Sequence, residues 1–271
     1  RESILIKMIQ IALDKFNVNS SIQLADSSNV ISKFYNYKFC KIPKIKKENI
    51  KKILIGLKKR KINFIIPTSD TELSFWSSHK NLLLKNKIYA MVSNFKTVKI
   101  CLDKYFFYKY LLDNKILTPH TSIKKITFKK KYLIKERFSS NQKKTPILLN
   151  HTNKKEFKNF KSPIYQEFIE GKEYSIDCGI AGSKINILIR KRIITFHGES
   201  EFTRIEKNEL IKKNIIKAIN LFKFEGHFMF QGIISNKDKK FYITECNARV
   251  GGMSIVSSLA GKDNVANFIA E

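Results

Sequence analysis

Apolar positions along the first 95 residues follow two different periods. Helical spacing, with apolar residues three or four positions apart, marks three stretches: 2–16, 30–35 and 49–59. Short apolar runs of strand length follow two of them: 22–25 and 62–66. A helix that leads into a fully apolar strand is typical of a buried parallel sheet. We therefore expect an open α/β sheet, and we expect its opening strand to be missing because the chain begins in a helical pattern.

After residue 94 the pattern changes twice. Residues 94–121 read as a helical connector, and beyond it strand patterns dominate: 132–135, 146–149, 164–169, 173–178, 184–189, 190–194, 226–235 and 241–247. Helical spacing returns at three places: 154–160, 210–222 and 254–259. The predicted fold class is thus α/β plus α+β. We expect one domain over 1–95 and a second over 96–271, with a smaller lid subdomain at about 123–165.

The stretch from Phe241 to Gly252 ends an apolar strand in polar side chains. Glu245, Asn247 and Arg249 recur at every second position, and alternate residues of a strand point to the same face. Carboxylate and amide oxygens suit Mg2+, and a guanidinium pairs with phosphate oxygens. The pattern therefore predicts a site for a magnesium-bound phosphate chain, although an ordinary surface strand would show the same alternation.

The turn at 236–239 predicts a hairpin between strands 226–235 and 241–247. Such a hairpin brings Gln231 within cross-strand reach of Glu245, in a register that sequence alone does not determine. Arg190 and Arg192 share one face of another strand, again at every second position.

Two polar segments follow predicted strands. Residues 68–72 come after strand 62–66, where they either cap the next helix or face a ligand at the carboxyl edge of the sheet. Residues 136–145 come after Lys135. This second segment either closes over phosphates or is an ordinary solvated hairpin turn.

Charge and cysteine usage narrow the class of protein. The 271 residues carry a formal charge of +29, which would ordinarily suggest a nucleic acid partner. Only seven of the 52 basic residues are arginine, and the lysines are spread along the whole chain, so we read the charge as compositional and do not favour nucleic acid. The four cysteines form no CxxC pair, and no apolar run reaches membrane-span length. We therefore expect a cytoplasmic protein with no membrane partner. A homodimer is compatible with the sequence.

Taken in order, these motifs resemble the ATP-grasp superfamily, and within it the branch similar to carbamoyl-phosphate synthase large subunits and related ligases. Residues 245–249, ECNAR, resemble the E-x-N-x-R signature, and 166–173, QEFIEGKE, resemble the nucleotide hinge. Residues 67–73, PTSDTEL, resemble a strand-end motif of the preceding, Rossmann-like pre-ATP-grasp domain. The resemblance implies a two-subdomain ATP-grasp fold over 96–271. It also implies a carboxylate–amine ligase that uses ATP and Mg2+ (or Mn2+) to activate a carboxylate as an acyl phosphate.

The resemblance also assigns roles at the phosphate end of the nucleotide. It implies that Glu245 and Asn247 hold the metal, with Gln231 as a further ligand. It also implies that three arginines contact the phosphates as catalytic residues: Arg190, Arg192 and Arg249.

The remaining implied contacts surround ATP itself. Lys104 and Lys135 would reach the phosphates, and Ser139 in the loop would cap them. Four hinge residues would line the adenine slot, partly through backbone groups: Gln166, Glu167, Phe168 and Ile169. Glu173 would accept the ribose hydroxyls.

Two alternatives remain open on the sequence. The loop 136–145 contains no glycine, whereas many relatives have several there, so a nucleotide-binding regulator without turnover is a second hypothesis. A basic nucleic-acid-binding module is a third, based on net charge alone. The carboxylate and amine substrates are not predicted.

Overall fold

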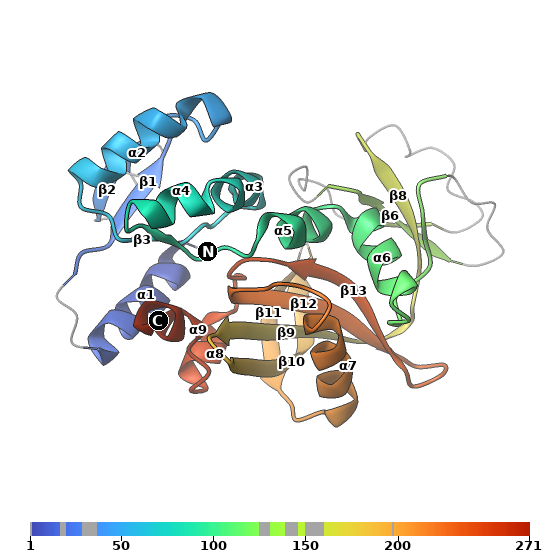
Figure 1. Cartoon of the computed structure of the whole chain (residues 1–271). Coiled ribbons are helices and arrows are strands. Elements are labelled where there is room, and N and C mark those ends of the chain that lie inside the picture. Colours follow the sequence, from blue (N-terminus) through green and yellow to red (C-terminus); the bar gives the residue numbers. More distant parts are fainter. Residues whose placement is uncertain are drawn as a thin grey trace.

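The computed structural model is a mixed α/β protein, as the sequence predicted (Figure 1). It describes residues 2–16, 20–28, 37–124, 131–138, 146–149, 160–196 and 198–271. Two predicted helices, at 30–35 and over most of 154–160, lie outside these ranges, and so does nearly all of the loop at 136–145.

The N-terminal part combines short helices with two pairs of parallel strands. Its elements are α1 (Glu2–Lys15), β1 (Gln23–Asp26), β2 (Lys38–Lys41), a 3-10 turn η2 (Lys47–Asn49), α2 (Ile50–Lys59), β3 (Phe64–Ile65), α3 (Asp70–Ser78), α4 (Lys80–Lys85) and β4 (Tyr89–Ala90). Strand β1 pairs with β2, and β3 pairs with β4, both in parallel. Parallel pairing was predicted, but full burial of the 62–66 strand was wrong, because the Phe64 side chain is 38% exposed.

Helix α3 begins where the polar segment 68–72 predicted a helix start. The Ser69 hydroxyl accepts the Thr71 N–H, and the Glu72 carboxylate accepts the N–H groups of Thr68 and Ser69, both at 2.8 Å. This reciprocal arrangement is a capping box, which satisfies donors that a helix start leaves free. The capping interpretation is therefore confirmed for Glu72, with Ser69 as the N-cap residue, but not for Asp70, whose carboxylate accepts hydrogen bonds from Arg249.

The largest sheet has five antiparallel strands in the order β11–β10–β9–β12–β13. Their bounds are β9 (Gly171–Ala181), β10 (Lys184–Phe196), β11 (Glu199–Ile205), β12 (Gly226–Ser235) and β13 (Phe241–Asn247). The predicted strands 184–189 and 190–194 are one continuous strand, β10, and β11 was not predicted. A long strand formed because β10 pairs with β9 along its first half and with β11 along its second.

Three helices accompany this large sheet (Figure 1): α5 (Phe95–Leu102), α6 (Lys104–Asp113) and α7 (Glu209–Ile219). Alternate residues of β9 and β12, such as Ile176 and Phe228, are fully buried in one hydrophobic core with residues of these helices, such as Phe107 and Ile215. The opposite face of the sheet carries polar side chains. This division follows from the two-residue period of strands.

A smaller antiparallel sheet lies beyond α6 (Figure 1). Its order is β5–β8–β6–β7, with β5 (Thr121–Ser122), β6 (Tyr132–Glu136), β7 (Ile147–Leu149) and β8 (Pro163–Glu167). The short core of this sheet includes Ile134, Leu149 and Tyr165. Strands β6, β7 and β8 fall close to the predicted positions, although β8 ends two residues earlier than expected, and β5 was not predicted.

The main core extends across residue 95. It joins Trp76 of α3 and Leu83 of α4 to Phe107 of α6 and to the large sheet. The chain closes with α8 (Ile255–Leu259) and α9 (Asn264–Ala270), and α9 was not predicted. Its Val265 and Phe268 share a second core with Met8 of α1, so the two ends of the described chain pack together.

Candidate functional site

The predicted hairpin places Gln231 and Glu245 directly opposite one another. Their Cα atoms are partners in the antiparallel pair of β12 and β13, with Met229 opposite Asn247 two residues further along. A register shift follows between Gln231 and Gly232. Bulges of this kind re-aim side chains near functional sites. Here the bulge allows Ile243 to enter the core while Glu245 faces the polar side of the sheet.

Lys104 reaches this polar face from the start of helix α6. The Asp103 carboxylate caps that helix by accepting the N–H groups of Tyr105 and Phe106, at 3.1 and 3.0 Å. The cap fixes the first helical residue, Lys104, whose Nζ lies 3.7 Å from Glu245 Oε2. Lys104 is 5% exposed, so this cation is held close to the carboxylate inside the protein.

Lys135 approaches the same carboxylate from the small sheet. Its Nζ donates to Gln166 Oε1 at 2.8 Å, and Gln166 Nε2 donates to Thr121 Oγ1 at 3.1 Å. Burial lowers the pKa of Lys135 from its usual value, with Glu245 opposing and Lys104 adding to the shift. Burial destabilises the charged form of such a lysine. A nearby anion stabilises that charged form again.

Arg192 completes the group from strand β10. Its Nη1 donates to Glu173 Oε2 at 2.9 Å and to Gln231 Oε1 at 3.3 Å. Its Nε donates to Ser200 Oγ at 2.9 Å, and its side chain is 8% exposed. The predicted ribose acceptor Glu173 and the predicted metal ligand Gln231 therefore share one guanidinium.

We call Glu245, Lys104, Lys135 and Arg192 the Glu245 cluster. Burial raises the pKa of the Glu245 carboxyl, but the three cations and a hydrogen bond from Asn247 outweigh burial and lower it overall. Glu245 is therefore ionised at neutral pH. Three cations against two carboxylates, Glu245 and the Glu173 that Arg192 binds, leave a net positive charge, which favours an anionic ligand.

The donor set is compatible with ATP and Mg2+. Within the described ranges, no three His, Cys, Asp or Glu side chains come together as a metal group, so protein acids alone do not make a cage. Mg2+ usually takes one or two carboxylates and completes its shell with substrate phosphates and water. Glu245, Asn247 and Gln231 could supply such a partial set, with phosphate oxygens facing the lysines. Gln231 would have to release its hydrogen bond from Arg192.

Arg249 is placed apart from the Glu245 cluster. Strand β13 ends at Asn247, so Arg249 does not continue the predicted alternation within the strand. Its Nε and Nη2 donate to the two carboxylate oxygens of Asp70 at 2.7 and 3.1 Å. This pair joins the end of the hairpin to the first residue of α3, 179 positions away in the chain.

Arg190 also lies apart, in a buried ion pair. Its Nε and Nη2 donate to Asp177 at 2.6 and 3.2 Å, and the Arg190 side chain is 1% exposed. The Ser254 hydroxyl donates to Asp177 at 2.8 Å, and His227 Nε2 lies 3.6 Å from it, beyond hydrogen-bond length. Burial raises the pKa of Asp177, but Arg190 and His227 lower it overall to about 2. The network ties β9 to the turn after Arg249.

The hinge residues connect strand β8 of the small sheet to strand β9 of the large sheet. Gln166 is 2% exposed, and its carboxamide is engaged by Lys135 and Thr121. The Glu167 and Phe168 N–H groups donate to the carbonyls of His120 and Lys131 at 2.8 and 3.1 Å. Ile169 is half-buried. Ser139 lies outside the described residues, so its predicted phosphate contact stays a prediction.

One contact that the sequence interpretation missed joins the two segments that carry Lys104 and Lys135. Arg137 Nε and Nη2 donate to the Asp103 carboxylate at 2.8 and 2.7 Å, and Lys104 N–H donates to the Arg137 carbonyl at 2.9 Å. The scarcity of arginine was the available signal, because its planar fork suits paired hydrogen bonds to a carboxylate. Three of the seven arginines form such pairs with aspartates here: Arg137, Arg190 and Arg249.

The comparison with protein families decides the identity of the fold. A family model described as an ATP-grasp domain matches residues 101–253. The chain belongs to the ATP-grasp family. The match spans the Glu245 cluster and the hinge, and it confirms the resemblance inferred from the E-x-N-x-R and hinge motifs. No curated protein sequence matches the chain.

Solved ATP-grasp structures share the overall fold at low sequence identity. Biotin carboxylase from Campylobacter jejuni, in a β-γ-ATP complex, is 12% identical with a TM-score of 0.70, over 98% of this chain and 68% of that one. N5-carboxyaminoimidazole synthetase from Staphylococcus aureus is 16% identical with a TM-score of 0.65, over 94% and 70%. L-amino acid ligase from Bacillus licheniformis is 15% identical with a TM-score of 0.61, over 82% and 58%. At these identities the likeness concerns the fold.

The described helices are too short or too polar to span a membrane.

Proposed function

We propose that this ATP-grasp protein is an ATP- and Mg2+-dependent ligase that activates a carboxylate as an acyl phosphate for attack by an amine or a similar nucleophile. The observation that carries the proposal is the convergence of Lys104, Lys135 and Arg192 on Glu245. Excess positive charge around one ionised carboxylate is the electrostatic requirement of a metal-bound phosphate chain. The described neighbours, a carboxylase in an ATP complex and two ligases or synthetases, support the same reaction class.

Each side chain of the Glu245 cluster has a separate task in this proposal. ATP and Mg2+, when bound, supply the phosphoryl group and neutralise its charge. Glu245 and Asn247 hold the metal, with Gln231 joining them. Lys104 and Lys135 orient the phosphates from two different elements, and Arg192 stabilises charge on the transferred group. Glu173, which is half-exposed, accepts the ribose hydroxyls.

Arg190 and Arg249 receive supporting tasks in place of direct phosphate contact. Arg190 fixes Asp177 and, through Ser254, the turn that follows the hairpin. Arg249 holds α3 against that turn through Asp70. We also infer a domain boundary near residue 95, between a parallel α/β domain and an ATP-grasp domain with a lid subdomain at about 123–165. The hydrophobic core is continuous across this boundary.

Turnover is the test of this proposal. The intact chain is mixed with ATP, Mg2+ and a panel of amino acids and other carboxylates, and release of ADP and phosphate is measured. Substrate-dependent release supports a ligase. ATP binding without turnover on any combination would favour a nucleotide-binding regulator, and binding to DNA or RNA that collapses with salt, without ATP binding, would favour the nucleic-acid hypothesis.

A further inference from the structure

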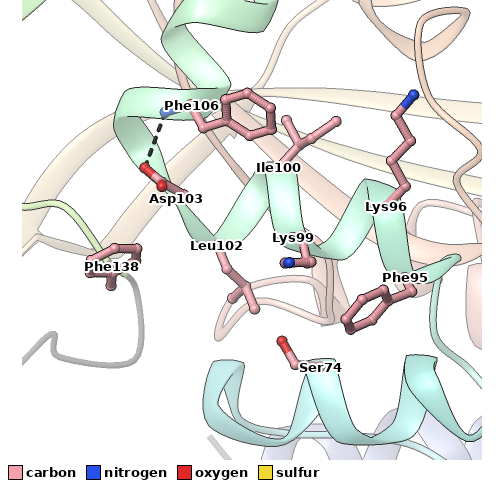
Figure 2. A pocket seen from close by; sticks show the side chains of 9 residues that line it. All are labelled: Ser74, Phe95, Lys96, Lys99, Ile100, Leu102, Asp103, Phe106 and Phe138. Atoms are coloured by element: carbon pink, nitrogen blue, oxygen red, sulfur yellow. Dashed lines mark hydrogen bonds between the residues drawn. The ribbon is translucent and has the colours of Figure 1, made fainter.

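A cavity of about 710 Å3 opens between helix α3, helix α5 and the first turn of α6 (Figure 2). Its volume falls within the usual range of small-molecule pockets, about 300–1,000 Å3. The cavity lies beside the Glu245 cluster without including it, because Asp103 lines it and the next residue, Lys104, contacts Glu245. Here we call it the α3–α5 cavity.

The walls of the α3–α5 cavity are mainly aromatic and aliphatic. Phe95, Phe106 and Phe138 line it together with Leu102. Phe95 and Phe106 are 43% and 49% exposed, so two large aromatic side chains of neighbouring helices face the same open space. Apolar walls of this kind gain free energy when an apolar ligand excludes water from them.

One cation points into this apolar space. Lys96 and Lys99 both line the cavity, and Figure 2 shows the Lys99 amine within it and the Lys96 amine extending away from it. Lys99 Nζ lies 5.3 Å from the centroid of the Phe95 ring, and no carboxylate of the described residues pairs with it. Ser74 brings a hydroxyl from α3 to the same space.

Among the described residues of the wall, the single acidic group, Asp103, is already neutralised. Asp103 accepts two hydrogen bonds from Arg137 and two backbone N–H groups at the start of α6. It therefore presents no free negative charge that would repel an anion. The described lining of the cavity thus combines apolar walls, a hydroxyl and two lysines, of which Lys99 points inward.

We propose that the α3–α5 cavity binds a small carboxylate with an apolar or aromatic body, the body against Phe95 and Phe106 and the carboxylate on Lys99. The assignment of this ligand as a substrate rests on the proposed ligase function. Binding itself does not, because the cavity is formed without the nucleotide. Such a pocket would restrict the ligase to hydrophobic carboxylates, including apolar amino acids.

Binding is tested on the intact chain without ATP, by calorimetry and ligand-observed NMR. The probes are acetate, phenylacetate, 3-phenylpropionate and the neutral phenylacetamide. We expect affinity to rise with apolar size by roughly threefold to fourfold per buried methylene. Lys99→Met should weaken phenylacetate binding about tenfold and leave phenylacetamide nearly unchanged, since a charge-assisted hydrogen bond is lost.

Lys96→Met is the matched control, because it removes an equal charge from a lining residue whose amine extends away from the cavity. Its phenylacetate affinity should stay within about twofold of the wild type, and Phe106→Ala should weaken the binding of all three aromatic probes. Lys96 and Lys99 are exposed, so both variants should unfold like the wild type. Equal losses in Lys96→Met and Lys99→Met, or no saturable binding of phenylacetate at millimolar concentration, would overturn the proposal.

Turnover then separates the substrate role from the proposed function. If the chain is a ligase of apolar carboxylates, Lys99→Met should raise KM for the carboxylate and leave KM for ATP unchanged. A ligase that turns over with unchanged carboxylate KM in Lys99→Met would contradict the substrate role alone. Absence of ATP binding would contradict the proposed function and leave the binding result standing.

Discussion

Arg137 and Asp103 join strand β6 of the small sheet to the start of helix α6 through two parallel hydrogen bonds, at 2.8 and 2.7 Å. Lys135 precedes Arg137 by two residues, and Lys104 directly follows Asp103. The Arg137 guanidinium also lies over the rings of Tyr105 and Phe138, at 5.5 and 5.0 Å from their centroids. The pair therefore sets the relative position of the two lysines that approach Glu245 from different elements.

Loss of this pair should affect nucleotide binding more than folding. The Arg137 and Asp103 side chains are 30% and 16% exposed, so after allowance for solvent the pair contributes about 1 kcal/mol. We expect Arg137→Met to weaken ATP binding roughly fivefold, and Arg137→Lys to fall between it and the wild type, because lysine keeps the charge without the fork. Calorimetry with ATP and Mg2+ measures this directly.

Arg204→Met is the matched control for that experiment. Arg204 also pairs with an acid, Glu206, but its side chain is 65% exposed and lies on β11. ATP affinity should not change in this variant. If Arg137→Met and Arg204→Met bind ATP equally well, the Arg137–Asp103 pair does not position the lysines.

The hairpin was predictable because its determinants are local, whereas its register was left open by the sequence and is given by the structure. A four-residue turn and two apolar strands bring Gln231 opposite Glu245, and the structure confirms this pairing. The capping box at Ser69 and Glu72 was predictable for the same reason. Both features depend on residues within about fifteen positions of each other.

The partners of the arginines were not predictable in this way. Arg249 pairs with Asp70 at a separation of 179 residues, and Arg190 pairs with Asp177 through the register of β9 and β10. Alternation along a strand specifies a face, but several chemically equivalent acids can meet an arginine on that face. Only the packing of α3 against the hairpin, and of β10 against β9, selects among them.

Removal of the Lys135 charge should stabilise the unliganded protein while it weakens ATP binding. Burial lowers the pKa of Lys135 below its usual 10.5, so the charged form costs folding free energy at neutral pH. As pH rises from the lowered pKa towards 10.5, the unfolded chain binds more protons than the folded one and stability increases. Lys135→Met removes this cost at neutral pH.

Thermal unfolding and calorimetry together check that expectation. Without ligand, Lys135→Met should have a higher Tm than the wild type at pH 7. This difference in Tm should become smaller above pH 10. ATP affinity should fall at least tenfold, because a phosphate contact is lost. Lys131→Met, an exposed lysine beside the same sheet, should change neither quantity. A lower Tm in Lys135→Met would show that the lysine stabilises the apo fold.

Asp177 should be essential for stability. Asp177→Asn leaves the Arg190 guanidinium buried without its counter-charge, which typically costs about 3–5 kcal/mol. In the wild type, the pKa of Asp177 is lowered from its usual 3.8 to about 2, so its contribution of roughly 2 kcal/mol is present above pH 4 and lost between pH 4 and pH 2.

Urea unfolding at pH 7 and across the acid range measures both effects. Asp177→Asn should lose several kcal/mol at pH 7 and lose less than the wild type on acidification. Asp113→Asn, in the last turn of α6, changes an exposed aspartate and should unfold like the wild type. Equal unfolding of Asp177→Asn and the wild type would remove Arg190 and Asp177 from the supporting role proposed above.

ATP binding by calorimetry in the presence of Mg2+, on the wild type and on Glu245→Gln, tests the central claim most directly. Glu245→Gln keeps the shape of the side chain but removes the carboxylate that the three cations surround, and Glu201→Gln, an exposed glutamate of β11, is its control. We expect Mg2+-dependent ATP binding by the wild type and by Glu201→Gln, and at least tenfold weaker binding by Glu245→Gln with cooperative unfolding retained. No ATP binding by the wild type, or equal binding by Glu245→Gln, would contradict the assignment of the Glu245 cluster as a nucleotide site.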